Sequence, residues 1–226
     1  MFRSLLLAAA LVATPALAQT DAAHPTVVEL YQSQGCSSCP PAITNLNALA
    51  DRPNLLTLTF AVTYWDQLGW KDTFASAAQT TRQWDYARGL KHDQVWTPQV
   101  IVDGRTDVVG AQAGQIEAAL KTVRPRTGPD LTLASGKVAI GAGSAPAGGA
   151  DVWLVRYNPR TIAVAIRAGE NTGRTIGHRN VVRQLVRIGK WTGTPATLGI
   201  PAGAPGLSTA VLVQTSGGPI LAAVRG

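Results

Sequence analysis

The chain contains two cysteines, Cys36 and Cys39, with two residues between them, and no others. A pair at this spacing can form a disulfide and exchange it with other thiols. An apolar run from Thr26 to Gln32 predicts a strand before the pair, and a helical pattern follows it. A helix N-terminus carries unpaired N–H groups and a partial positive charge, which favour a thiolate. We therefore predict a thiol–disulfide oxidoreductase or redox switch without a cofactor, in which Cys36 is the exposed nucleophile and Cys39 resolves.

Other roles for the cysteine pair stay open from the sequence. A fixed disulfide that pins the turn would stabilise the chain little, because the loop that it closes is short. Two thiolates also suit Cu(I), so a copper-handling protein with His24 or His92 assisting is an alternative. A closed zinc site needs about four ligands, which two cysteines and three scattered histidines supply poorly.

The residues after the pair predict alternating helices and strands. Ile43, Leu46 and Leu49 recur at helical spacing. The next strand, Leu55 to Val62, should lie parallel to the first, because a helix crossover joins them. The other predicted elements are a helix from Thr73 to about Leu90 capped by Asp72, a strand from Gln99 to Val102, a hairpin at Asp103-Gly104, a strand from Thr106 to Val109 and a helix from Ala113 to Val123.

This order of elements, β-α-β-α-β-β-α, resembles the core of thioredoxin-like proteins. The resemblance implies that Pro98 is a cis-proline facing the dithiol and that Thr97 presents its backbone to the substrate. It also implies that Glu29 is a buried acid that helps proton transfer from the resolving thiol. An ordinary trans proline in a turn is the alternative for Pro98.

Four blocks give a closer resemblance, to a family of exported bacterial proteins catalogued as domain of unknown function 1223. The blocks are VELYQSQGCSSCPPA, YWDQLGWKDTFAS, TPQVIVDGR and GENTGRTIGHRNVVR, and they extend over nearly the whole chain after its first residues. The resemblance implies a fold and an exported location but no reaction.

Four aromatic residues are candidates for a recognition surface beside the predicted dithiol site. Tyr64, Trp65, Trp70 and Trp96 are candidates to line a pocket or peptide groove for a protein or small-molecule thiol or disulfide substrate, since aromatic anchors dominate recognition surfaces. The alternative is that they belong to the core between the sheet and a helix. His178 would lower the pKa of the Cys36 thiol if it packed nearby.

Charge divides the chain into two parts. Residues 19–126 hold nine Lys and Arg against ten Asp and Glu, whereas residues 127–226 hold ten against three. We predict a thioredoxin-like domain over 19–126 and a β-rich, sandwich-like domain over 127–226. The predicted strands of the second domain are 131–134, 137–140, 150–158, 161–168, 178–188, 208–214 and 220–224.

Arg179, Arg183 and Arg187 are spaced by four residues and form a predicted basic strip in the second domain. Such a strip could meet an acidic partner, and together with the aromatic loop it suggests a non-catalytic binding module as an alternative function. A solvated strand face that keeps a β-edge from aggregating is the alternative explanation.

The first residues indicate export. Arg3, an apolar run over 5–12 and the small-residue site Ala16-Leu17-Ala18 predict a signal peptide over 1–18 that is removed near Ala18. We expect a periplasmic or secreted protein, a location in which nucleic acid is not a partner. No later run approaches the ~20 apolar residues of a membrane span.

Overall fold

The computed structural model describes residues 24–124 and 126–226, so the predicted signal peptide and its cleavage site lie outside the described residues. The first half of the described chain follows the predicted order of elements. Its elements are β1 (Thr26–Gln32), α1 (Cys39–Leu49), β2 (Leu55–Ala61), the 3-10 turn η1 (Asp66–Leu68), α2 (Ala77–Leu90), β3 (Gln99–Val102), β4 (Thr106–Val109) and α3 (Ala113–Lys121).

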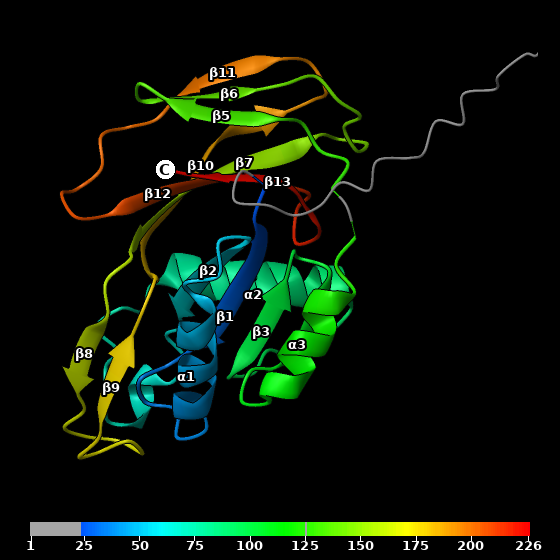
Figure 1. Cartoon of the computed structure of the whole chain (residues 1–226). Helices are drawn as coiled ribbons and strands as arrows, with labels where there is room; N and C mark the ends of the chain where they lie inside the picture. Colours follow the sequence, from blue (N-terminus) through cyan, green and yellow to red (C-terminus); the bar gives the residue numbers. More distant parts are fainter. Residues whose placement is uncertain (1–23, 125) are drawn as a thin grey trace, which may run out of the picture.

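The second half contains only strands among its described elements (Figure 1). Seven runs were predicted, and two further strands, β9 and β11, are present. The strands are β5 (Leu131–Ala134), β6 (Lys137–Ile140), β7 (Ala150–Asn158), β8 (Ile162–Ala165), β9 (Thr175–His178), β10 (Val181–Trp191), β11 (Ala196–Gly199), β12 (Ser208–Gln214) and β13 (Ile220–Arg225).

An eight-stranded sheet is the centre of the fold, with the strand order β13-β12-β7-β10-β2-β1-β3-β4. As predicted, β1 and β2 are parallel. The sheet crosses the predicted boundary between the two halves where β10 lies beside β2: Val181 pairs with Thr59, and the Thr59 N–H donates to the Asn180 carbonyl at 2.9 Å. The protein thus has a mixed α/β fold dominated by sheets.

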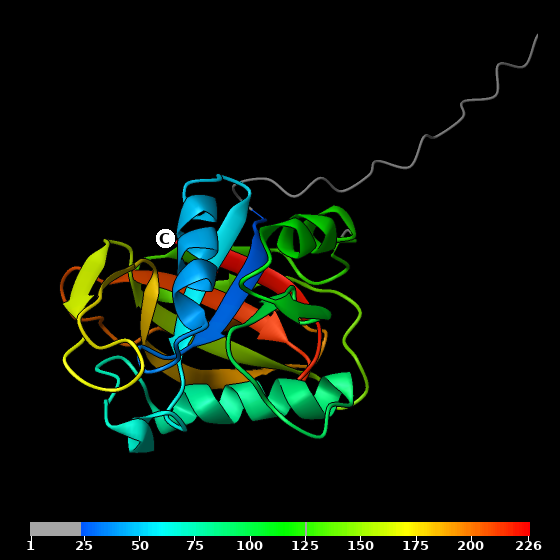
Figure 2. The same ribbon diagram turned by 90° about the horizontal axis from the view of Figure 1, so that it is seen from below.

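Helices cover both faces of the first half of this sheet (Figure 2). On one face, α1 and α3 bury Ile43 and Ile116 against Val28 and Leu30 of β1. On the opposite face, α2 buries Tyr86 against Val27 and Tyr31 of β1, among other residues. Alternate residues of β1 therefore belong to two different core clusters, as the twofold period of a strand requires.

Two smaller sheets complete the second half. The order β11-β6-β5 forms a three-stranded sheet, which packs on the large sheet through Val138 and Ile140 of β6 and Val152, Leu154 and Trp191 of the large sheet. Strands β8 and β9 form a separate antiparallel hairpin, which lies beside α1 (Figure 1).

One helix start differs from the prediction. Helix α2 begins after Ser76, whose hydroxyl accepts from the Gln79 N–H at 3.4 Å, so Asp72 does not cap it. Within 24–124 and 126–226, no helix combines the length and apolar character needed to cross a membrane.

Candidate functional site

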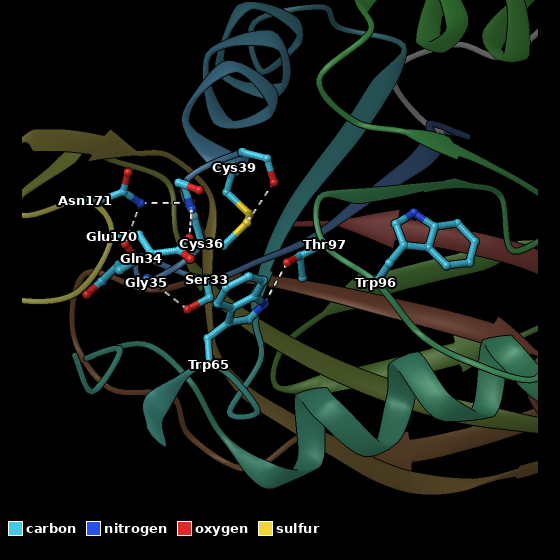
Figure 3. Close-up of a disulfide and its surroundings, with 12 residues drawn as sticks. Ser33, Gln34, Gly35, Cys36, Cys39, Trp65, Trp96, Thr97, Glu170 and Asn171 are labelled. Carbon is cyan, nitrogen blue, oxygen red and sulfur yellow. Dashed lines mark hydrogen bonds between the residues drawn. A yellow bond between two sulfur atoms is a disulfide. The ribbon is translucent and has the colours of Figure 1, made fainter. Parts of the chain in front are cut away.

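Cys36 and Cys39 form a disulfide at the end of the turn that leads from β1 into α1 (Figure 3). Helix α1 begins at Cys39 with Ser38 as its N-cap residue, and prolines stand in its first turn. Proline fits there because its missing N–H would have no partner within the helix. The Ser38 hydroxyl lies 3.2 Å from the Cys36 sulfur. The sulfur pair is therefore at the positive end of a helix, as predicted.

The predicted exposure of Cys36 is wrong. Cys36 and Cys39 are both 0% exposed, and they belong to the core cluster between the sheet and α1. Only the tip of the turn, Ser37 and Ser38, is exposed. Cys36 thus lies just beneath the surface, and no attacking group can reach its sulfur in this conformation.

The loop between β8 and β9, residues 166–174, lies against the cysteine turn (Figure 3). The side chain of Asn171 is fully buried, and its Nδ2 donates to the carbonyls of Gln34 and Cys36, both at 2.8 Å. The Glu170 carboxylate accepts from the Ser37 N–H at 3.0 Å, and the Ser37 side chain together with this N–H holds the pKa of Glu170 below its usual value. Sequence reasoning did not select Glu170 or Asn171, although both lie in the polar block GENTGRTIGHRNVVR.

Two of the predicted aromatic residues border the turn. The Trp65 indole N–H donates to the Thr97 hydroxyl at 2.8 Å, and Trp65 packs against both core clusters beside the sheet. The Trp70 indole N–H donates to the side-chain carbonyl of Gln34 at 2.9 Å. Trp65, Trp70 and Thr97 are therefore beside the site, partly buried, and tied to it by hydrogen bonds.

The other two aromatic candidates lie elsewhere. The Tyr64 hydroxyl bonds to the Gln83 side chain at 3.3 Å, and burial raises the pKa of Tyr64 to about 12. Trp96 stacks edge-on against His92 at 5.2 Å between ring centroids, and its ring points away from the disulfide in Figure 3. These two side chains belong to packing around α2 and the 91–97 segment.

The peptide bond between Thr97 and Pro98 is cis, as the thioredoxin-like resemblance implied. Pro98 is buried directly before β3, and the Thr97 side chain faces Trp65 next to the disulfide (Figure 3). The alternative of a trans turn proline is therefore wrong.

Glu29 is buried as expected but lies on the opposite face of β1 from the cysteines. Its neighbours in β1, Val28 and Leu30, pack with Cys36 and Cys39, whereas Glu29 faces α2. There it forms an ion pair with Arg82, with Nη2 to Oε1 at 2.7 Å, and both side chains are almost fully buried. The structure does not bring this carboxylate to the disulfide.

His178 does not act on Cys36 as a cation. Its imidazole is 0% exposed and packs edge-on against Phe74 at 5.4 Å between ring centroids. Burial lowers the pKa of His178 to about 4, so the ring is neutral at neutral pH. A neutral imidazole cannot lower the pKa of a thiol by its charge.

Asp72 is an acidic residue at the site whose position sequence reasoning misassigned. One of its carboxylate oxygens accepts from the Gln34 N–H at 2.7 Å and the other from the Phe74 N–H at 2.8 Å. Burial raises the pKa of Asp72 to about 6, although these hydrogen bonds oppose the shift. Asp72 therefore fixes the backbone of the cysteine turn two residues before Cys36.

The predicted basic strip is used within the chain. Arg179 forms two hydrogen bonds with Asp51, at 2.6 and 2.7 Å, and Arg187 pairs with Asp151 at 2.7 Å. The Arg183 guanidinium lies 5.2 Å from the centre of the Phe74 ring. Each of the three arginines thus has a partner in this chain.

The histidines proposed to assist copper are paired with acids. His92 lies 3.1 Å from Asp107, and His24 lies 3.9 Å from Asp130. Across the described part of the chain, no three His, Cys, Asp or Glu residues are grouped as a metal site would require.

Comparison with known proteins finds one family model and two similar solved structures. The family model described as "Protein of unknown function (DUF1223)" matches residues 27–214. A protein of Agrobacterium tumefaciens known from a crystal structure is 32% identical, with 90% of this chain and 94% of that chain covered and a TM-score of 0.74. HBP35 of Porphyromonas gingivalis is 10% identical, with coverage of 90% and 75% and a TM-score of 0.55, which shows a shared fold alone. No curated protein matches the chain.

Proposed function

The chain belongs to the DUF1223 family, whose description gives no reaction, and from the geometry of its cysteine site we propose that it is a thiol–disulfide exchange protein. In this proposal Cys36 and Cys39 form the reactive pair, on a thioredoxin-like first half. Trp65, Thr97 and Pro98 form the neighbouring wall of the site. We further propose that the protein works in the periplasm or outside the cell, where disulfides persist.

The observation that carries the proposal is the position of the disulfide at the first turn of α1. A bridge between residues three apart constrains little chain entropy, so stabilisation is a weak reason for it to exist. Once the bridge is reduced, a Cys36 thiolate would be stabilised by the positive end of α1 and by the Ser38 hydroxyl at 3.2 Å. These two features are typical of a working redox couple.

The reaction of the oxidised protein with a substrate dithiol proceeds in two displacements. A substrate thiolate attacks the Cys36 sulfur, and the Cys36–Cys39 bond breaks with its electron pair on Cys39, which takes up a proton. The second substrate thiolate then attacks the substrate sulfur of the mixed disulfide and releases Cys36, which is protonated in turn. The protein gains two electrons and two protons, and the substrate leaves as a disulfide. The reverse sequence oxidises the protein with a substrate disulfide.

Mixed-disulfide trapping tests the proposal. Reduced protein with Cys39→Ser is mixed with a peptide whose single cysteine is in a disulfide with glutathione, so that the glutathione thiolate leaves when Cys36 attacks, and the adduct is measured by mass spectrometry. We expect an adduct through Cys36, because the resolving sulfur is missing, and none with Cys36→Ser as the matched control. Absence of an adduct with Cys39→Ser over hours, together with a reduction potential below about −300 mV for the wild-type pair, would show a static bridge.

A further inference from the structure

The loop over residues 166–174 comes from the second half of the chain, yet it lies against the backbone of the cysteine turn in the first half (Figure 3). Ile166, at the start of the loop, packs in the same core cluster as Cys36 and Cys39. Gly169 lies against Trp70, because a Cβ added at Gly169 would be 3.3 Å from the Trp70 Cβ. The loop thus packs against the turn in which Cys36 has no exposed surface.

The bonds between the loop and the turn have the pattern that a polypeptide backbone could supply. The turn offers two carbonyl acceptors, those of Gln34 and Cys36, and one N–H donor, that of Ser37. In the loop, the Asn171 amide donates to the two carbonyls, and the Glu170 carboxylate accepts from the N–H. An extended peptide carries N–H donors and carbonyl acceptors, so it can satisfy the same three groups.

The loop is built so that it can leave without unfolding the strands beside it. Gly169 and Gly173 have φ values of +74° and +82°, and hydrogen bonds within the loop join Ile166 to Arg174 and Gly173 to Ile166. Most of its side chains are exposed, and Asn171 is the polar side chain of the loop that is fully buried. The hairpin behind it is held separately, because the Asn47 amide donates to the Gly177 carbonyl at 2.8 Å.

We propose that the 166–174 loop occupies the substrate position of the cysteine turn and blocks it until a polypeptide thiol or disulfide takes its place. The inference rests on the proposed function and adds to it a substrate class, a cysteine within an extended peptide. Asn171 is the positioning residue that holds the loop closed. Glu170 also places a negative charge beside the turn, which opposes formation of a Cys36 thiolate.

The test compares the rate at which the disulfide is reduced in four proteins: wild type, Asn171→Ala, Glu170→Ala and Asn45→Ala. Asn45 is the matched control, because it also donates to a backbone carbonyl, that of Gly110 at 3.0 Å, but on α1 away from the turn. Reduction by dithiothreitol is followed by stopped-flow tryptophan fluorescence and by thiol labelling. Loss of two hydrogen bonds in Asn171→Ala is expected to raise the rate about tenfold to thirtyfold.

Glu170→Ala changes an exposed side chain, so this variant should fold like the wild type. Loss of one hydrogen bond should raise the rate of disulfide reduction about threefold to tenfold. Asn45→Ala should react at the wild-type rate. A dithiol peptide of about ten residues should reduce wild type faster than dithiothreitol at equal thiolate concentration, and this advantage should shrink in Asn171→Ala.

Equal rates in wild type, Asn171→Ala and Glu170→Ala would overturn the inference that the loop blocks the site. Equal rates for the peptide and dithiothreitol on wild type would overturn the assignment of a peptide substrate. Failure of the proposed function has a different signature: Asn171→Ala would react faster with dithiothreitol, while Cys39→Ser in either background would form no adduct with a disulfide peptide.

Discussion

Acidification should destabilise the protein through His178. This residue is fully buried, and its two ring nitrogens have no hydrogen-bond partner in the described structure. Burial lowers its pKa from 6.5 to about 4, whereas in the unfolded chain the ring is protonated below about pH 6.5. The unfolded state therefore binds more protons between these two values. The neutral ring costs no stability above pH 6.5, and stability is lost progressively as the pH falls toward 4.

The magnitude follows from the size of the pKa shift. One pKa unit corresponds to about 1.4 kcal/mol, so His178 should remove about 2 kcal/mol of stability between pH 7 and pH 5, and about 3 kcal/mol by pH 4. Asp72 titrates in the same range with the opposite sign, because its pKa is raised to about 6. The pH dependence of the wild type alone therefore mixes both groups, and a variant is needed to separate them.

His178→Phe supplies that comparison. Phenylalanine keeps the edge-on packing against Phe74 and removes the titrating nitrogens, while Asp72 is unchanged. Urea unfolding of both oxidised proteins, followed by tryptophan fluorescence at pH 7 and pH 5, gives the two free energies of unfolding. The difference between wild type and variant should change by about 2 kcal/mol between the two pH values. An unchanged difference, or an NMR titration of the native imidazole with its midpoint near pH 6.5, would refute the reasoning.

Three further predictions concern stability. Arg82→Met should lower the free energy of unfolding by about 3 to 5 kcal/mol, because it leaves Glu29 buried without its partner; adding Glu29→Leu should restore most of the loss, and urea unfolding at pH 7 measures both. Gly89→Ala in α2 should lower the melting temperature although alanine favours helices, because the new Cβ would lie 1.9 Å from a carbonyl oxygen of the turn between β12 and β13. Gly114→Ala in α3, where no atom lies within 4 Å of the new Cβ, should stabilise the folded protein by about 0.5 kcal/mol. If the melting temperatures of Gly89→Ala and Gly114→Ala both rose or both fell, the result would contradict the geometry. The wild type should lose about 2 kcal/mol through Asp72 as the pH rises from 4 to 6, because the pKa of this buried acid is raised to about 6; Asp72→Asn should lack this loss in urea unfolding at the two pH values.

The sequence predicted elements well where local signals agree. Strands β1, β3, β4 and β7 have the predicted bounds, because alternating or apolar runs end at clear turns such as Asp103-Gly104. The cis bond before Pro98 came from the resemblance to thioredoxin-like proteins. These features depend on residues that are close to one another in the chain.

The errors concern contacts between residues far apart in the chain. The predicted exposure of Cys36 was wrong because the turn packs against distant parts of the chain, such as Ile166 in its core cluster and Asn171, 135 residues later, which donates to the Cys36 carbonyl. The face occupied by Glu29 could not be read from alternation alone, since the irregular segment 33–35 separates β1 from Cys36. The arginine strip also has partners, such as Asp51, that are more than 100 residues away. Spacing along the chain does not encode such pairings.

The junction of β2 with β10 has a consequence for anyone who shortens this protein. Production of residues 24–126 alone would remove β10 from beside β2, while β1 would stay on the other side. The backbone groups of β2 that face β10 would then be exposed and could pair with other molecules. The cysteine turn would lose its hydrogen bonds to Glu170 and Asn171 in the same cut, since residues 166–174 would be absent. The reactivity of Cys36 and Cys39 in such a fragment would differ from that in the full protein, so assays should use the full chain.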